Sequence, residues 1–181
     1  MNVTVIRSNR KTICAETDGY NITVRAPFGV SFDIIEKFLD RNMKKILACA
    51  KKQREKKEQT EKIKKLNDGE ICQCFETAKD VIEKKAEYFS SLIGVRYGRI
   101  KLKKMRTRWG SCSSEGNMNF NFLLALTPEY VLSGVVAHEV CHLKHMNHSR
   151  SFYDELYKIY PEYERCRIWL KENGFKILAK I

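Results

Sequence analysis

The sequence lacks the features that place a protein in or across a membrane. It contains no run of about 18 apolar residues, which is the length a helix needs to span a bilayer. The N-terminus, MNVTVIRSNRKT, has no apolar segment followed by a small-residue cleavage site, as a secretory signal would have. We therefore expect a cytoplasmic protein with no membrane partner.

Paired cysteines are also missing. The seven cysteines are an odd number, are scattered along the chain and form no CxxC pair. Without a secretory signal, this distribution favours reduced thiols over a disulfide framework. It also argues against a zinc site built from cysteines.

The size and charge of the chain allow several kinds of partner. With 181 residues, 43% of them hydrophobic and 31% charged, the chain fits one globular domain, or one domain with a small appendage. The formal net charge of +12 favours polyanionic neighbours such as nucleic acid, ribosomes or nucleotides. The alternative is a lysine-rich surface that only contacts water.

The first 68 residues predict a small unit of strands and a helix. Residues 3–6, 12–16 and 20–27 alternate as strands do, and Asp18-Gly19 suits a hairpin turn, so we expect a small antiparallel sheet. Ser31 suits the N-cap of a helix that begins near Phe32. The charged residues 51–68 fit either a continuation of this helix or a linker.

Residues 69–181 predict an α+β unit, which is either separate from 1–68 or continuous with it. We expect a helix over 75–92 closed by Gly94, strands over 99–105 and 117–122, and a turn at 113–116. Thr127 and Pro128 predict the start of the next helix. Two more helices are expected over 151–160 and 161–173, the second ending at Gly174.

All four histidines of the chain lie within residues 138–148. Two of them, His138 and His142, form an HExxH motif together with Glu139. His138 and His142 are four residues apart, so on a helix both imidazoles can bind one Zn²⁺. Glu139 would then lie beside the ion and could take a proton from water, which makes it the candidate general base. A catalytic zinc site needs a third protein ligand and one open position.

The third ligand is either His145 or His148. On a continuous helix His145 would lie roughly 10 Å along the axis from His138, and three ligands in a row along a rod cannot surround a tetrahedral ion. The chain has to bend first, and Met146-Asn147 is a plausible end for the helix. We therefore predict His148 as the third ligand. His145 would at most support a metal ligand by a hydrogen bond or contact the substrate.

Three segments together resemble the YgjP-like metallopeptidases, which are relatives of the Wss1-like and SprT-type zinc proteases. These segments are RWGSC at 108–112, GNMNFNF at 116–122 and HEVCHLKHMNHSRSF at 138–152, and the N-terminal patterns VIRSNRKT and TVRAP are similar as well. The resemblance implies a zincin-like catalytic unit with His138, His142 and His148 as Zn²⁺ ligands and Glu139 as the base.

Zincins generally bind an extended peptide along a strand at the rim of the cleft. The strand 117–122 directly precedes the histidine helix, so Asn117, Asn119 and Asn121 are candidates for this rim; the alternative is a core strand whose asparagines face water. Four further residues are weaker candidates: Arg106 and Arg108 for holding a carboxylate or phosphate, and Asn147 and Ser149 for orienting the ring of His148. Trp109 and Cys141 are expected to be packing residues.

These observations predict a zinc-dependent metallopeptidase that acts on a peptide or protein. Two alternatives stay open. A basic protein with a hydrolytic zinc could instead cleave a nucleotide phosphoanhydride, and a nucleic-acid or ribosome-associated module could hold a zinc that is mainly structural.

Overall fold

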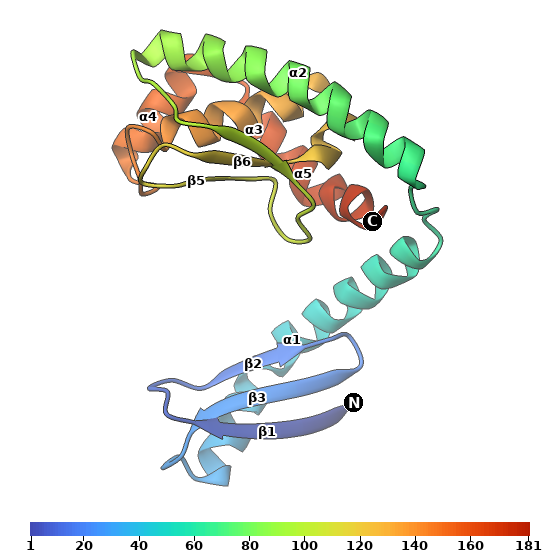
Figure 1. Ribbon diagram of the computed structural model, residues 1–181. Coiled ribbons are helices and arrows are strands. Elements are labelled where there is room, and N and C mark those ends of the chain that lie inside the picture. Colours follow the sequence, from blue (N-terminus) through green and yellow to red (C-terminus); the bar gives the residue numbers. More distant parts are fainter. The chain divides into compact units, whose positions relative to one another are not determined.

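The computed structural model describes residues 1–181. The chain forms two compact units, Met1–Lys62 and Ile63–Ile181, each with its own three-stranded sheet (Figure 1). None of the helices is both long and apolar enough to cross a membrane.

The first unit contains a mixed sheet rather than the antiparallel sheet predicted. The strands β1 (Asn2–Ser8), β2 (Cys14–Thr17) and β3 (Asn21–Pro27) lie in the order β1-β3-β2. The predicted hairpin joins β2 to β3, which pair antiparallel. β1 pairs parallel with β3 because the connection after Ser8 carries the chain across to the far edge of β3. Ile22 and Val24 on β3 are buried and form the centre of this unit's core.

The helix α1 (Phe32–Glu61) continues through the charged stretch, so most of residues 51–68 are helical rather than a linker. The hairpin turn packs against this part of the helix. A Cβ on Gly19, which has a φ of +97°, would lie 2.9 Å from Cγ of Arg54, and Nζ of Lys57 lies 5.2 Å from the centre of the Tyr20 ring. These contacts stabilise a segment that has almost no apolar side chains of its own.

The second unit is mixed α+β, as predicted. Its elements are α2 (Asp68–Ile93), β4 (Ile100–Lys103), β5 (Gly110–Cys112), β6 (Met118–Asn121), the 3-10 helix η1 (Phe122–Leu126), α3 (Glu129–Cys141), α4 (Arg150–Ile159) and α5 (Tyr163–Leu178). Asn67 and Glu70 form a capping box at the start of α2. Gly94 closes α2 in the left-handed conformation, which confirms the predicted end of this helix.

The sheet of the second unit is also mixed, with β6 at its centre. The order is β4-β6-β5, in which β6 pairs parallel with β4 and antiparallel with β5. Met118 and Phe120 of β6 are fully buried and pack in the core that α2 and α3 complete. The alternate residues of the strands, among them Asn119, therefore lie on the opposite face.

The helix α3 is buried on nearly all sides, which explains why its residues are almost uniformly apolar. It contacts α2, α4, α5 and β5. Close approach to α5 depends on Gly134, where a Cβ would lie 2.7 Å from Sγ of Cys166. The core therefore fixes α3, and with it the first two histidines.

Gly174 lies inside α5 and does not end it, contrary to the prediction. The helix continues to Leu178. A Cβ on Gly174 would lie 3.2 Å from Cζ2 of Trp109, so the glycine gives the indole a flat surface to pack on. Trp109 is a half-buried member of the core, as expected of a packing residue.

Candidate metal centre

Two histidines lie at the C-terminal end of α3 and project from the same side of it. The centres of the His138 and His142 rings are 4.9 Å apart. His142 is the C-cap, so α3 ends at Cys141 and not near Met146 as predicted. The chain turns directly after His142, where the amide of Leu143 donates to the carbonyl of Val140 and that of His145 to the carbonyl of Cys141.

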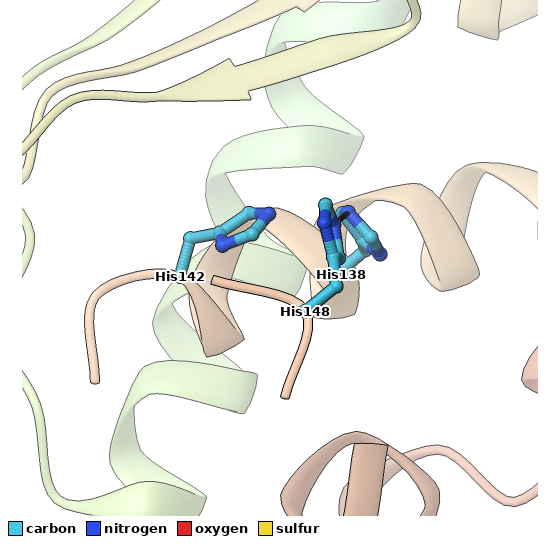
Figure 2. A group of neighbouring side chains, drawn as sticks. All are labelled: His138, His142 and His148. Carbon is cyan, nitrogen blue, oxygen red and sulfur yellow. Dashed lines mark hydrogen bonds between the residues drawn. The ribbon is translucent and has the colours of Figure 1, made fainter. Parts of the chain in front are cut away.

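This early turn brings His148 back toward the helix. Nε2 of His148 lies 3.1 Å from Nε2 of His138, and the candidate ligand atoms of His138, His142 and His148 all lie within 4.8 Å of one another (Figure 2). Two nitrogen atoms bound to one tetrahedral zinc are about 3.3 Å apart, because each Zn–N bond is about 2.0 to 2.1 Å. The spacing of the rings therefore suits a single ion.

The environment keeps two of the three imidazoles neutral. Burial, together with His142 and His148, lowers the pKa of His138 to about 3. Burial also lowers the pKa of His142. A neutral imidazole has a free lone pair, which is the form that binds a metal.

A backbone carbonyl supports the ring of His142. Nδ1 of His142 lies 2.9 Å from the carbonyl oxygen of His145, so Nδ1 carries the proton and Nε2 is left free. The ring of His145 faces elsewhere, with its Nε2 3.9 Å from a carboxylate oxygen of Glu155. Glu155 also accepts a hydrogen bond from Lys144 at 2.9 Å and so ties the turn to α4.

Tyr163 of α5 supports the ring of His138 in the same way, and the sequence contains no local signal for this contact. Its Oη lies 2.9 Å from Nδ1 of His138, and the two rings stack with their centres 5.6 Å apart. Burial raises the pKa of Tyr163, so its hydroxyl stays neutral, and its oxygen can accept a hydrogen bond from Nδ1–H of His138.

Phe152 of α4 forms an apolar wall beside all three histidines. It is fully buried, and the centre of its ring lies 4.9 Å from that of His138, 4.7 Å from that of His142 and 4.9 Å from that of His148. Such packing restricts the imidazole rings to few orientations. In the sequence, Phe152 was only the last residue of the segment 138–152 that resembles the family, and nothing marked it as part of the site.

Glu139 lies beside the edge strand β5. Its side chain is packed so closely on Gly110 that a Cβ there would lie 2.5 Å from Oε1 and 2.6 Å from Cγ of Glu139. Only 6% of Glu139 is exposed, and burial raises its pKa to about 8. The carboxylate has no hydrogen-bond partner in the protein, which leaves it available to water.

The predicted rim strand is wrong. Because β6 is the central strand, both of its edges are already paired, and it cannot add a peptide. Asn117 lies in the turn, where its side chain bonds to the amide of Arg99 and to Glu115. Asn119 donates to Oγ of Ser111, and Asn121 is fully buried rather than facing water.

The side chains of four other candidate residues form no hydrogen bond with the histidines. The side chains of Asn147 and Ser149 form no hydrogen bond with His148, and Ser149 occupies the N-cap position of α4. Arg106 and Arg108 are exposed and form no ion pair. Cys141 is fully buried, as predicted.

Comparison with known families decides the affiliation of the chain. Residues 74–173, more than half of the sequence, match the family described as YgjP-like, metallopeptidase domain. The chain belongs to the YgjP-like family. The resemblance seen in the sequence motifs is thereby confirmed, and the candidate residues of this YgjP-like chain all lie within the matched segment.

Two further comparisons add little to this family assignment. No curated protein matches the chain. Among solved structures, the metallopeptidase zymogen of Pyrococcus abyssi, abylysin, is 22% identical, with a TM-score of 0.45 over 50% of this chain and 93% of that one.

The donor set of the YgjP-like chain fits the metal that a metallopeptidase requires. Three imidazoles lie around one point. Nδ1 of His138 is hydrogen-bonded to Tyr163, and Nδ1 of His142 is hydrogen-bonded to the carbonyl oxygen of His145. Metal-binding histidines characteristically have such partners. No carboxylate or thiol belongs to the cluster, which leaves Glu139 outside the set of candidate ligands.

Proposed function

We propose that this YgjP-like protein is a zinc-dependent peptidase in which Nε2 of His138, His142 and His148 bind Zn²⁺ and Glu139 is the general base. The observation that carries the proposal is the gathering of these three imidazoles, with a buried glutamate at the next position to His138. Three histidine ligands with an open fourth position are typical of catalytic rather than structural zinc.

The chemistry divides between the ion and the side chains. When bound, the ion supplies positive charge that acidifies water, polarises a carbonyl and favours the ionised form of Glu139. Glu139 accepts a proton from the water that attacks the peptide carbonyl and delivers it to the departing amine nitrogen. Phe152 and Tyr163 hold the imidazoles in place during these steps.

We propose β5 as the strand that binds the substrate, in place of β6. β5 is an edge strand, so its free side can pair with an extended peptide. Gly110 at its start contacts Glu139, which would put a peptide paired with β5 next to the base. Because Gly110 has no side chain, there is room beside it for both the Glu139 side chain and a bound peptide.

The activity is assigned to the second unit, which contains every proposed site residue. All seven cysteines are free, and this supports a reducing compartment such as the cytoplasm.

The test is hydrolysis of unstructured, casein-like peptides by purified full-length protein, with and without a chelator. We expect cleavage that the chelator stops and that added Zn²⁺ restores. Glu139→Gln should bind one equivalent of Zn²⁺ and show no cleavage, because the amide cannot accept a proton. Full activity of Glu139→Gln would overturn the role of the base.

Nucleoside triphosphates belong in the same assay. Chelator-sensitive phosphate release without peptide cleavage would replace the peptidase proposal with the nucleotide hydrolase alternative.

A further inference from the structure

The second unit leaves one face of its sheet without a helix over it. Met118 and Phe120 of β6 face the core, so the alternate side chains of the sheet lie on the opposite, outer face. On β4 these are Lys101 and Lys103, both exposed, whereas Ile100 and Leu102 between them are half-buried. The outer face of β4 is therefore lined by lysines.

The loop between β4 and β5 is fixed over the same face. Asn121 lies opposite Lys103 in the sheet, and its Nδ2 donates to the carbonyl of Met105 at 2.7 Å and to that of Arg108 at 3.1 Å. Asn121 itself has no exposed surface. Two bonds from one buried amide hold the backbone that carries three exposed cations, which are Lys104, Arg106 and Arg108.

These cations have no acidic partners, unlike others in the same unit. On α4 and α5, Arg150 pairs with Asp154, Arg165 with Glu162, and Arg167 with Glu164. By contrast, none of the five basic residues on β4 and the loop forms an ion pair. We call these five residues the basic sheet face: Lys101, Lys103, Lys104, Arg106 and Arg108.

The charges are separated across the strand β4. Beside Ile100 lies a cavity of about 370 Å³ that three acids of α2, Asp80, Glu83 and Glu87, line together with one lysine, Lys84. Acids thus outnumber lysines on this side of β4, whereas the charged side chains on the outer face of β4 are lysines alone. A lysine-rich surface that only contacts water would not require this separation.

We propose that the basic sheet face binds the phosphate backbone of a nucleic acid, without reading its sequence. Exposed arginines and lysines on a rigid, polar surface are typical of backbone contacts. An acidic protein would be expected to bury apolar side chains at the centre of the contact. None of the large, exposed hydrophobic residues lies between Leu92 and Met146, which argues against a protein partner here. The proposal does not depend on peptidase activity.

The experiment measures binding of a fluorescein-labelled 20-nucleotide strand to full-length protein by fluorescence anisotropy at several salt concentrations, with DNA and RNA of the same sequence as separate arms. The test variant combines Lys101→Gln, Lys103→Gln, Arg106→Gln and Arg108→Gln. The control variant removes four other exposed charges of the second unit through Lys64→Gln, Lys79→Gln, Lys84→Gln and Lys171→Gln. Both variants lose the same net charge, so long-range attraction falls equally in the two.

We expect the test variant to bind at least about tenfold more weakly near 0.1 M salt. The steepness of its log affinity against log salt should fall by about 3, because each of the four lost phosphate contacts reduces that slope by about 0.7. The control should change affinity less than about threefold. Equal weakening in the two variants, an unchanged salt slope, or no measurable binding by the natural protein would overturn the proposal. So would a glutamate-rich peptide that displaces the strand at an equal concentration of charge.

Discussion

The hydroxyl oxygen of Tyr163 lies 2.9 Å from Nδ1 of His138, across 25 residues of sequence. This contact determines which nitrogen of the ring is free. With its proton on Nδ1 and directed at Tyr163, His138 presents the lone pair of Nε2 toward His148. Tyr163 therefore acts through His138 and is a positioning residue.

Replacing Tyr163 should weaken metal binding. In Tyr163→Phe the ring stays in place but Nδ1 loses its acceptor, so we expect affinity for Zn²⁺ to fall by about 10- to 100-fold. Competition with a chromophoric chelator measures this. The matched control is Tyr157→Phe, because the hydroxyl of Tyr157 lies 3.4 Å from Glu164 and does not reach His138. If the two variants bind Zn²⁺ equally well, the role of Tyr163 is wrong.

Adding a methyl group at Gly110 should displace Glu139. The Cβ of Gly110→Ala would lie 2.5 Å from Oε1 of Glu139, so one of the two groups has to move. We expect kcat/KM for peptides to fall on the order of 100-fold, as misplacement of a catalytic group by about 1 Å can cause. Affinity for Zn²⁺ should change little, because Glu139 is not a proposed ligand.

Ser111→Ala is the control for Gly110→Ala, since Ser111 is the next residue of β5 and lies on the outer face with Asn119. It should retain most of the activity. A similar loss in both variants would mean that the effect comes from β5 as a whole and not from the contact with Glu139.

Removing the amide of Asn121 should destabilise the second unit. Asn121→Ala leaves the carbonyls of Met105 and Arg108 without their donor, and we expect the free energy of unfolding to fall by roughly 2 to 3 kcal/mol. Asn119→Ala, which removes one bond on a half-buried residue, should cost less than about 1 kcal/mol. Urea denaturation of both variants checks this, and equal losses would contradict the role of Asn121 in fixing the loop.

The buried carboxyl of Glu139 should make the stability of the metal-free protein depend on pH. Its pKa is about 8 in the folded protein and about 4.5 when unfolded, so between these values the folded state binds the extra proton. The free energy of unfolding therefore falls as the pH rises from 4.5 to 8. The glutamine of Glu139→Gln does not titrate, so its stability has no such pH dependence. The free energy of unfolding of the natural protein should therefore fall relative to that of the variant as the pH rises from 4.5 to 8. Urea denaturation at pH 5, 6.5 and 8 in chelator measures the difference, and a constant difference would show that Glu139 is not buried as described.

The parts of the site that the sequence could predict are those set by local spacing. His138, Glu139 and His142 depend only on the geometry of one helix, and the choice of His148 over His145 rested on the need for the chain to bend. The structure has such a bend, although it begins directly after His142. Local signals therefore identified the cluster more reliably than the end of its helix.

The features that the sequence could not predict depend on contacts between distant segments. Which strand is central depends on pairing partners, so β6 looked like a rim although β5 and β4 flank it. Gly174 was predicted to end its helix because glycine is common at helix ends. Its actual role, packing against Trp109, involves a residue 65 positions earlier and so gives no local signal. Tyr163 has no motif at all, and only the packing of α5 on α3 brings it to His138.

The most direct test of the account is X-ray anomalous scattering at the zinc edge from crystals of Zn²⁺-loaded protein. We expect one strong peak at about 2.0 to 2.1 Å from Nε2 of His138, His142 and His148, with the remaining side of the ion open toward Glu139 and β5. A peak elsewhere, or none between these three rings at full metal loading, would contradict the proposed centre and the peptidase built on it.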